Sequence, residues 1–284
     1  MSDPIRLFVL FVDDLAAKVW KPVLTAAAEA DGWDVLSGTV DNWAQMTHRC
    51  LILSDDPDWG IVVPADRSAV IMMGPPRWEG RNPADSAQKD ALALASARLA
   101  KASALISGGA VQVGGETTSW TLPELGTVAS ETGSVMIPMT PASPLDIYRM
   151  IPPQPGAIAV WPARCLSFPV GEDLDGGRPE IDLTGRGRIL FHGPHLYLTP
   201  GVWRVTFQVS VDPEGSIPPL RFDWKHGDSA VHFDAPINQP GRYEIYLERR
   251  WDVVGPCQVS GILQQAVFQG RLELHDCRVE MLSL

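Results

Sequence analysis

The chain has 284 residues, which is enough for two domains that each bury a core of their own. Its 45% hydrophobic and 20% charged residues are typical of a globular protein and exclude a disordered tail. The net charge is −11 and there is no basic run, which argues against nucleic acids and anionic membranes as partners.

The first apolar run, residues 5–12, is too short to span a bilayer and lacks a small-residue cleavage site. We therefore expect a cytoplasmic protein without a membrane span. The four cysteines form no Cys-x-x-Cys pair, so neither a zinc site nor a redox motif is indicated. Cys257 and Cys277 could meet within a sheet structure, but we expect free, buried thiols. We expect no metal site and no cofactor.

Residues 1–115 have the pattern of an α/β domain. The run 5–12 predicts a strand buried on both faces, and residues 15–30 have apolar side chains at helical spacing, with Pro22 expected to disturb that helix. A second helix is expected over residues 85–105. Further short strands are expected at residues 33–36, 50–53, 61–63, 69–73 and 110–113, with 61–63 and 69–73 close enough to form a hairpin.

Acidic pairs follow two of these strands. Asp13-Asp14 follows the first strand and Asp55-Asp56 follows residues 50–53, an arrangement that resembles the pocket of a response-regulator receiver domain. No intervening helix fits between residues 53 and 61, and no strand followed by a lysine occurs later. We therefore interpret these aspartates as helix caps and turn residues.

A loop after the strand at 69–73 contains Arg77, Trp78 and Arg81 and precedes the long helix. In open α/β sheets, ligands bind near the carboxyl ends of strands and the N-termini of helices. These three side chains could hold an anionic or sugar-containing ligand. A rigid surface loop, or an interface loop in an oligomer, is the alternative interpretation.

Residues 116–155 are expected to form a Pro-rich linker or strap, because prolines are dense from Pro138 onward and charges are few. Several of the ten tryptophans in the chain lie in polar loop contexts, such as Trp43 and Trp59. Such tryptophans mark either a protein interface or a seam between two domains.

Residues 156–284 alternate strictly between apolar and polar side chains, which predicts an all-β, antiparallel sandwich. In residues 201–211 one face carries Trp203 and the other carries Arg204 and Gln208. The phase of the last strand slips near His275-Asp276-Cys277, which predicts a β-bulge.

The spacing His226-x-Asp228-x-x-x-His232-x-Asp234 could be interpreted as a set of metal ligands. The alternative is a hairpin that turns at Gly227-Asp228. In that hairpin Arg221 pairs with Asp234, Asp223 with His232, Phe222 with Phe233 and Trp224 with Val231. The hairpin explains each residue without a metal, so we favour it.

The segment Arg188–Phe207 and the closing strand Gly270–Met281 resemble jelly-roll modules similar to carbohydrate-binding modules, which occur beside bacterial polysaccharide-biosynthesis proteins. The resemblance implies a non-catalytic glycan-binding or scaffold role, and local motifs of serine or cysteine nucleophiles are absent. Sugar sites combine a planar aromatic ring with polar side chains. The residues of this kind on the polar strand faces are Arg204, Gln208, Tyr246, Glu248 and Arg250.

Two alternatives to glycan binding stay open at this point. One is an enzyme that acts on a nucleotide-sugar or a glycan with its site on the Arg77–Arg81 loop. The other is a structural protein that forms oligomers through its tryptophan-bearing loops.

Overall fold

The computed structural model describes residues 6–38, 40, 48–74, 76, 86–130, 143–169, 179–227 and 229–284. The chain divides into two compact units. The α/β unit consists of Met1–Pro76, Arg98–Met139 and Tyr148–Pro152, and the sandwich unit consists of Arg77–Ala97, Thr140–Ile147 and Pro153–Leu284. Helix α2 (Ser86–Ser107) therefore contributes residues to both units. No helix in the described ranges has both the length and the apolar character needed to cross a membrane.

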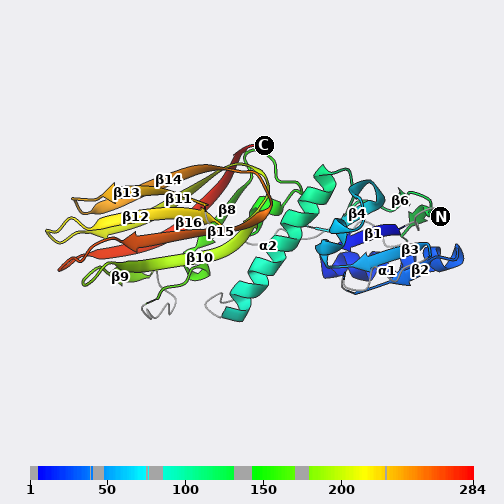
Figure 1. Cartoon of the computed structure of the whole chain (residues 1–284), viewed down its shortest axis with the longest axis horizontal. Coiled ribbons are helices and arrows are strands. Elements are labelled where there is room, and N and C mark those ends of the chain that lie inside the picture. Colours follow the sequence, from blue (N-terminus) through cyan, green and yellow to red (C-terminus); the bar gives the residue numbers. More distant parts are fainter. Residues whose placement is uncertain are drawn as a thin grey trace. The chain divides into compact units, whose positions relative to one another are not determined.

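The α/β unit is built on a five-stranded parallel sheet with the order β2-β3-β1-β4-β5 (Figure 1). Every residue of β3 and β4 is buried, and so is nearly all of β1, as expected for strands covered on both faces. The parallel sheet supports part of the expectation of an α/β domain in this region. The strands are β1 (Arg6–Phe11), β2 (Asp34–Leu36), β3 (Cys50–Ser54), β4 (Ser68–Met72) and β5 (Val111–Gly114).

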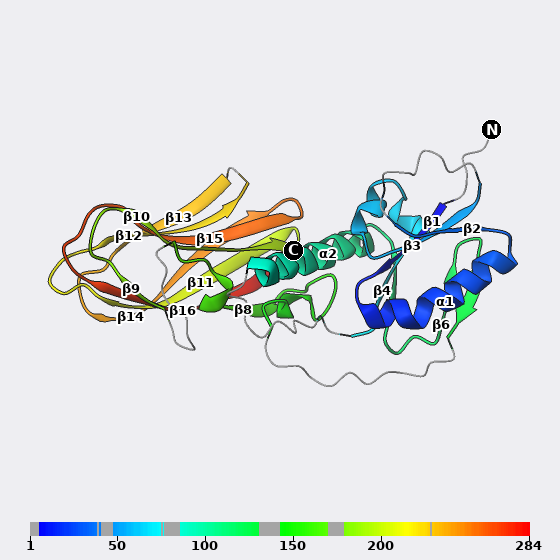
Figure 2. The ribbon, with the colours of Figure 1, turned by 90° about the horizontal axis from the view of Figure 1, so that it is seen from below.

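Helix α1 (Asp14–Ala30) lies along the sheet and buries Trp20 and Leu24 in the core of the unit (Figure 2). It begins at Asp13, whose carboxylate accepts a hydrogen bond of 2.7 Å from the backbone N–H of Ala16. The expectation that Pro22 disturbs the helix is wrong, because α1 continues through it. Pro22 lies on the exposed side, so its ring points toward solvent while the opposite side keeps its packing.

The strand expected at residues 61–63 is also wrong. A 3₁₀ helix, η2 (Pro57–Ile61), ends at the first of these residues, and Val62 and Val63 follow it in a turn and a bend. The Asp56 carboxylate caps η2 by accepting a hydrogen bond of 3.0 Å from the N–H of Asp58. A second 3₁₀ turn, η3 (Ala65–Arg67), follows. Because β4 pairs in parallel with β1 and β5, there is no hairpin. A run of three apolar residues is too short for periodicity to distinguish a strand from a helical turn.

The region expected as a linker contains a short antiparallel hairpin, β6 (Ser119–Leu122) and β7 (Gly126–Ala129), followed by the 3₁₀ turn η4 (Asp146–Tyr148). The hairpin belongs to the core of the α/β unit. Its Trp120 packs edge-on against Trp20 of α1, with ring centroids 6.0 Å apart.

The sandwich unit contains two antiparallel sheets, as predicted (Figure 2). One has the order β10-β15-β12-β13, and the other has the order β14-β11-β16-β8, with β9 pairing at one end of β16. The bounds are β8 (Ile158–Pro162), β9 (Glu180–Asp182), β10 (Arg188–Leu198), β11 (Gly201–Asp212), β12 (Pro219–His226), β13 (Ser229–Pro236), β14 (Gly241–Trp251), β15 (Gly255–Leu263) and β16 (Arg271–Ser283). The 3₁₀ turn η5 (Ala163–Cys165) follows β8.

Aromatic side chains fill the space between the two sheets. Phe207 of β11 and Phe222 of β12 lie 5.1 Å apart, and Trp224 of β12 meets Trp251 of β14 edge-on at 5.0 Å. Alternation along β11 buries Trp203 and Phe207 and leaves the intervening residues half-buried.

All four cysteines lie in the described ranges, where they are buried and form no disulfide, as expected. Burial raises the pKa of the Cys257 thiol to about 12 and also raises the pKa of Cys277. These thiols are therefore packing residues of the core.

The hairpin predicted at Gly227-Asp228 is confirmed. Strand β12 pairs with β13 in the register Arg221↔Asp234, Phe222↔Phe233, Asp223↔His232 and Trp224↔Val231. Arg221 donates two hydrogen bonds to the Asp234 carboxylate, at 2.7 and 3.0 Å. No group of ligating side chains that could hold a metal occurs among the residues that the structure describes. Asp228, one of the four residues of the alternative metal-ligand spacing, lies outside the described residues.

The predicted bulge in the last strand is confirmed as well. Gln208 of β11 pairs with Asp276 of β16, whereas Val209 pairs with Leu274, so His275 is the extra residue.

Candidate functional site

Strands β14, β11 and β16 are neighbours, so the polar residues predicted on β11 and β14 lie together. The register places Tyr246 opposite Thr206, Glu248 opposite Arg204 and Glu244 opposite Gln208. These side chains share the outer surface of the sheet because the alternate residues of both strands are buried inside. We call the surface formed by Arg204, Thr206, Gln208, Glu244, Tyr246 and Glu248 the Tyr246 face.

Tyr246 is the exposed aromatic residue of this face, with 63% of its surface accessible. The guanidinium carbon of Arg204 lies 5.5 Å from the centroid of its ring, within the range of a cation–π contact. Arg204 also donates two hydrogen bonds to Oε1 of Glu248, at 2.9 and 2.5 Å, and this pairing holds the pKa of Arg204 above its ordinary value. The orientation of Arg204 is thus fixed beside the ring.

Both polar atoms of the Gln208 side-chain amide have hydrogen-bonding partners, which fix its orientation. Its Nε2 donates to Glu244 at 3.1 Å, and its Oε1 accepts from Arg242 at 2.7 Å. Glu244 and Arg242 were not predicted as site residues from the sequence. The signal that could have found them is their spacing of two and four residues from Tyr246, which puts them on the same face of one strand. The result is a planar ring flanked by oriented charged and amide groups.

Arg250 lies opposite Val202 on the same side of β14 and is exposed. It makes no ion pair with any residue that the structure describes. It therefore adds a cationic group to one end of the Tyr246 face.

The residues predicted on the loop before α2 cannot be compared with this arrangement. Arg77, Trp78 and Arg81 lie outside the described residues.

The acidic pairs of the α/β unit meet at the carboxyl ends of β1, β2 and β3, where they line a cleft of about 310 Å³. Three of these four carboxylates, those of Asp13, Asp55 and Asp56, have partners within the unit. Asp13 caps α1 and also accepts from the N–H of Met73 at 2.9 Å, while Asp56 caps η2. Asp55 pairs with Arg98 at 2.7 Å. For Asp13 and Asp56, the interpretation as capping residues is confirmed.

The tryptophans in the described ranges are buried within the chain, so the interpretation of these residues as exposed interface markers is wrong. Even Trp59, in a polar sequence context, is 2% exposed because its indole N–H donates to the carbonyl of Gly38 at 2.8 Å. Trp43 and Trp78 lie outside the described residues. The buried ones are Trp20, Trp33, Trp59, Trp120, Trp161, Trp203, Trp224 and Trp251.

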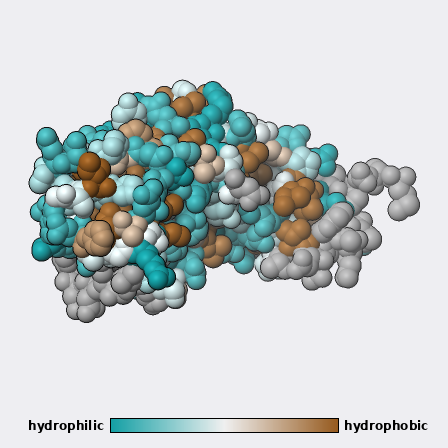
Figure 3. Space-filling view, turned by 60° about the vertical axis from the view of Figure 1, so that its left-hand side comes forward, coloured by the Kyte–Doolittle hydropathy of each residue, from teal (hydrophilic) through white to brown (hydrophobic). Residues whose placement is uncertain are grey.

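The surface drawn in Figure 3 is mainly hydrophilic, with hydrophobic side chains in separate groups. The two described apolar residues with the largest exposure are Phe268, in the β15–β16 loop, and Ile61, at the end of η2. Scattered apolar residues of this kind are normal on monomers and do not by themselves indicate an oligomer interface.

No protein-family model matches the sequence, and no curated protein matches it either. The solved structures that match include carbohydrate-binding modules. The CBM22-1 xylan-binding domain of Paenibacillus barcinonensis Xyn10C is 9% identical, covers 46% of this chain and 98% of its own, and gives a TM-score of 0.31. TmCBM61, determined in complex with β-1,4-galactotriose, is 12% identical, covers 44% of this chain and 82% of its own, and gives a TM-score of 0.27.

Proposed function

We propose that this protein binds carbohydrate on the Tyr246 face. The observation that carries the proposal is the exposed Tyr246 ring, held among side chains whose polar groups are already oriented. The apolar face of a pyranose ring stacks on a planar aromatic side chain, while the sugar hydroxyls need hydrogen-bonding partners around it. Arg204, Gln208 and Glu248 supply donors and acceptors beside the ring.

The side chains of the Tyr246 face are already ordered before a ligand binds, which favours binding. Side chains that are already fixed by mutual hydrogen bonds lose less conformational freedom when a ligand arrives. Because the face is open and its groups are exposed, we expect modest affinity.

We further propose that the glycan belongs to bacterial polysaccharide synthesis and that the protein works in the cytoplasm. The four described cysteines are buried and none is in a disulfide, which supports a reducing compartment, since disulfides are rare there.

The test is a glycan array followed by calorimetry with the Tyr246→Ala variant. We expect Tyr246→Ala to weaken binding by about 10- to 100-fold, which corresponds to the ~1–3 kcal/mol that a stacked aromatic contributes at a binding site. The stability of the variant should be unchanged, because the ring is exposed. Phe233→Ala is the matched control, since it removes a half-exposed aromatic residue from β13 of the other sheet. Absence of binding to any glycan, or equal effects of the two variants, would contradict the proposal.

A further inference from the structure

A serine, a histidine and a glutamate are aligned at one end of the sheet that carries the Tyr246 face. The hydroxyl oxygen of Ser210 lies 2.7 Å from Nε2 of His275. On the other side of the imidazole ring, Nδ1 lies 3.5 Å from Oε1 of Glu273. A serine, an imidazole and a carboxylate in this order are the parts with which hydrolases activate a hydroxyl group.

The β-bulge brings these three residues together. Ser210 pairs with Glu273 across β11 and β16, and His275 is the extra residue two positions later. Leu274 and Cys277, on either side of the bulge, are fully buried in the core. The bulge thus directs the His275 ring toward the side of the sheet on which Ser210 and Glu273 lie, and bulges are often found next to active sites for this reason.

The environment of His275 selects the tautomer that catalysis needs. Its side chain is 6% exposed, and its Nδ1 is buried facing the Glu273 carboxylate. A proton on Nδ1 is favoured by that carboxylate, which leaves a lone pair on Nε2 to accept the Ser210 proton. The separation of 3.5 Å is longer than a hydrogen bond, as is common in catalytic groups before substrate binds.

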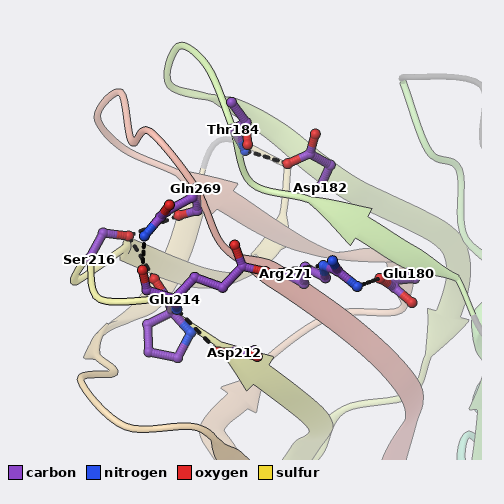
Figure 4. Close-up of polar contacts among 9 residues, drawn as sticks. Glu180, Asp182, Thr184, Asp212, Glu214, Ser216, Gln269 and Arg271 are labelled. Carbon is purple, nitrogen blue, oxygen red and sulfur yellow. Dashed lines mark hydrogen bonds and ion pairs between the residues drawn. The ribbon is translucent and has the colours of Figure 1, made fainter.

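Ser210 and Glu273 also line a cleft of about 380 Å³, so a substrate can reach the hydroxyl group. Arg271 is the one cationic residue in the described lining of this cleft. Two carboxylates hold it, with Glu180 at 3.1 Å from Nη1 and Glu214 at 3.2 Å from Nε (Figure 4). A cation fixed in this way can stabilise the negative charge that develops on a carbonyl oxygen.

Hydrogen bonds also hold the loop that carries Glu214. The Ser216 hydroxyl donates to the backbone carbonyl of Gln269 at 2.8 Å, and the Gln269 amide donates to the backbone carbonyl of Glu214 (Figure 4). These contacts tie the β11–β12 loop to the β15–β16 loop beside Arg271.

We propose that Ser210, His275 and Glu273 hydrolyse short-chain carboxylic esters in this cleft. The Ser210 oxygen bonds to the ester carbonyl carbon while its proton passes to Nε2 of His275. The bond from that carbon to the alcohol oxygen then breaks, and the alcohol leaves with the proton from His275. A water molecule then attacks the carbonyl carbon of the acyl-serine and gives one of its protons to Nε2 of His275. The bond between that carbon and the Ser210 oxygen breaks, and His275 returns this proton to the Ser210 oxygen. A carboxylic acid is released.

The position of the cleft indicates the substrate class. Ser210, Gln208 and Thr206 alternate along one side of β11, and Tyr246 lies opposite Thr206. Four residues of strand span ~13 Å at ~3.4 Å per residue, so a saccharide on the Tyr246 face can extend an acyl substituent toward Ser210. We therefore assign acylated carbohydrates as the substrate class, and this assignment rests on the proposed carbohydrate binding.

The first experiment needs no carbohydrate. The full chain is treated with a fluorophosphonate probe and mapped by peptide mass spectrometry, and its hydrolysis of 4-nitrophenyl acetate is measured. We expect a phosphonyl adduct on Ser210, and a fall in kcat/KM of about 10²–10⁴-fold in Ser210→Ala, the usual contribution of such catalysis. Ser229→Ala, which removes an exposed serine from the other sheet, should keep both the adduct and the rate. His275→Asn should lose the adduct while Ser210 is still present.

Far-UV circular dichroism and thermal melting establish that each variant is folded. If His275→Asn fails to fold, Ser210→Ala decides, because it removes only a hydroxyl group. A label on a different serine, no label at all, or an unchanged rate in Ser210→Ala would overturn the proposal.

The second experiment separates esterase activity from carbohydrate binding by comparing acetylated xylan with 4-nitrophenyl acetate. We expect Tyr246→Ala to lower the rate of acetate release from acetylated xylan, relative to the rate of 4-nitrophenyl acetate hydrolysis, by about 10-fold or more. Phe233→Ala, on the other sheet, should leave both rates unchanged. If wild type and Tyr246→Ala hydrolyse each substrate at the same rate, the substrate assignment and the proposed binding face are both overturned. The proposed hydrolytic site is not affected by that result. Carbohydrate binding without any hydrolysis would overturn the hydrolytic site alone.

Discussion

The α/β unit and the sandwich unit each contain a cleft lined with carboxylates, and the clefts have similar volumes of about 310 and 380 Å³. In the α/β cleft the carboxylates hold the fold, since Asp13 and Asp56 cap helices and Asp55 pairs with an arginine. In the sandwich unit, Glu273 lines the cleft and faces the buried imidazole of His275. The other ring nitrogen of His275, Nε2, is hydrogen-bonded to the Ser210 hydroxyl group. Acidic residues therefore indicate chemistry only when their partners can move a proton or accept a substrate.

The largest effect should come from neutralising one carboxylate in each cleft. We expect Glu273→Gln to lower 4-nitrophenyl acetate hydrolysis by about 10²-fold or more, because an amide no longer favours the Nδ1–H tautomer of His275. Asp55→Asn in the α/β cleft should leave hydrolysis unchanged. Steady-state kinetics on both variants measures this contrast, and an equal loss of rate in the two would remove the distinction between the clefts.

A smaller effect is expected on stability from Asp13. Asp13→Ala removes the cap of α1 and the acceptor for the Met73 N–H, so we expect the free energy of unfolding to fall by about 1–3 kcal/mol. Urea denaturation measures the loss. Asp13→Asn keeps an oxygen that can cap the helix and should recover part of the stability. A change in carbohydrate binding or in ester hydrolysis upon Asp13→Ala would show that this residue does more than support the fold.

The smallest effect is expected from Arg204 on the Tyr246 face. Arg204→Ala removes a cation–π contact and an exposed ion pair, each worth no more than ~1 kcal/mol, so carbohydrate affinity should fall by about 2- to 5-fold. The free energy of unfolding should change by less than about 1 kcal/mol. Calorimetry and denaturation on the same variant give both numbers. A loss of affinity as large as that of Tyr246→Ala would make Arg204, rather than the ring, the centre of the site.

Much of the sandwich could be predicted from the sequence because strand alternation has a strict period of two. The turn at Gly227-Asp228 fixed the hairpin register, and the complementary pair Arg221 and Asp234 agreed with it. The phase slip near His275 predicted the bulge. The same alternation placed Tyr246 and Glu248 on the outside, and only the pairing of β11 with β14 was needed to complete the face.

Other features depend on contacts between distant segments and left no local signal. Ser210 and His275 are 65 positions apart, so no short motif contains them, and their contact exists only because β11 pairs with β16 across a bulge. In the α/β unit, Ile61 and Val63 suggested a strand, but capping by Asp56 and burial of Trp59 produced a 3₁₀ helix. Short apolar runs do not carry enough periodicity to resolve such cases.

A crystal structure of Ser210→Ala with a bound oligosaccharide, preferably one that carries an O-acetyl group, tests the proposed binding face and the proposed hydrolytic site together. The expected result is a pyranose ring stacked on Tyr246, with the acetyl group in the cleft beside Arg271. An oligosaccharide bound elsewhere, such as in the cleft formed by Asp13 and Asp55, with Tyr246 uncovered, would contradict it.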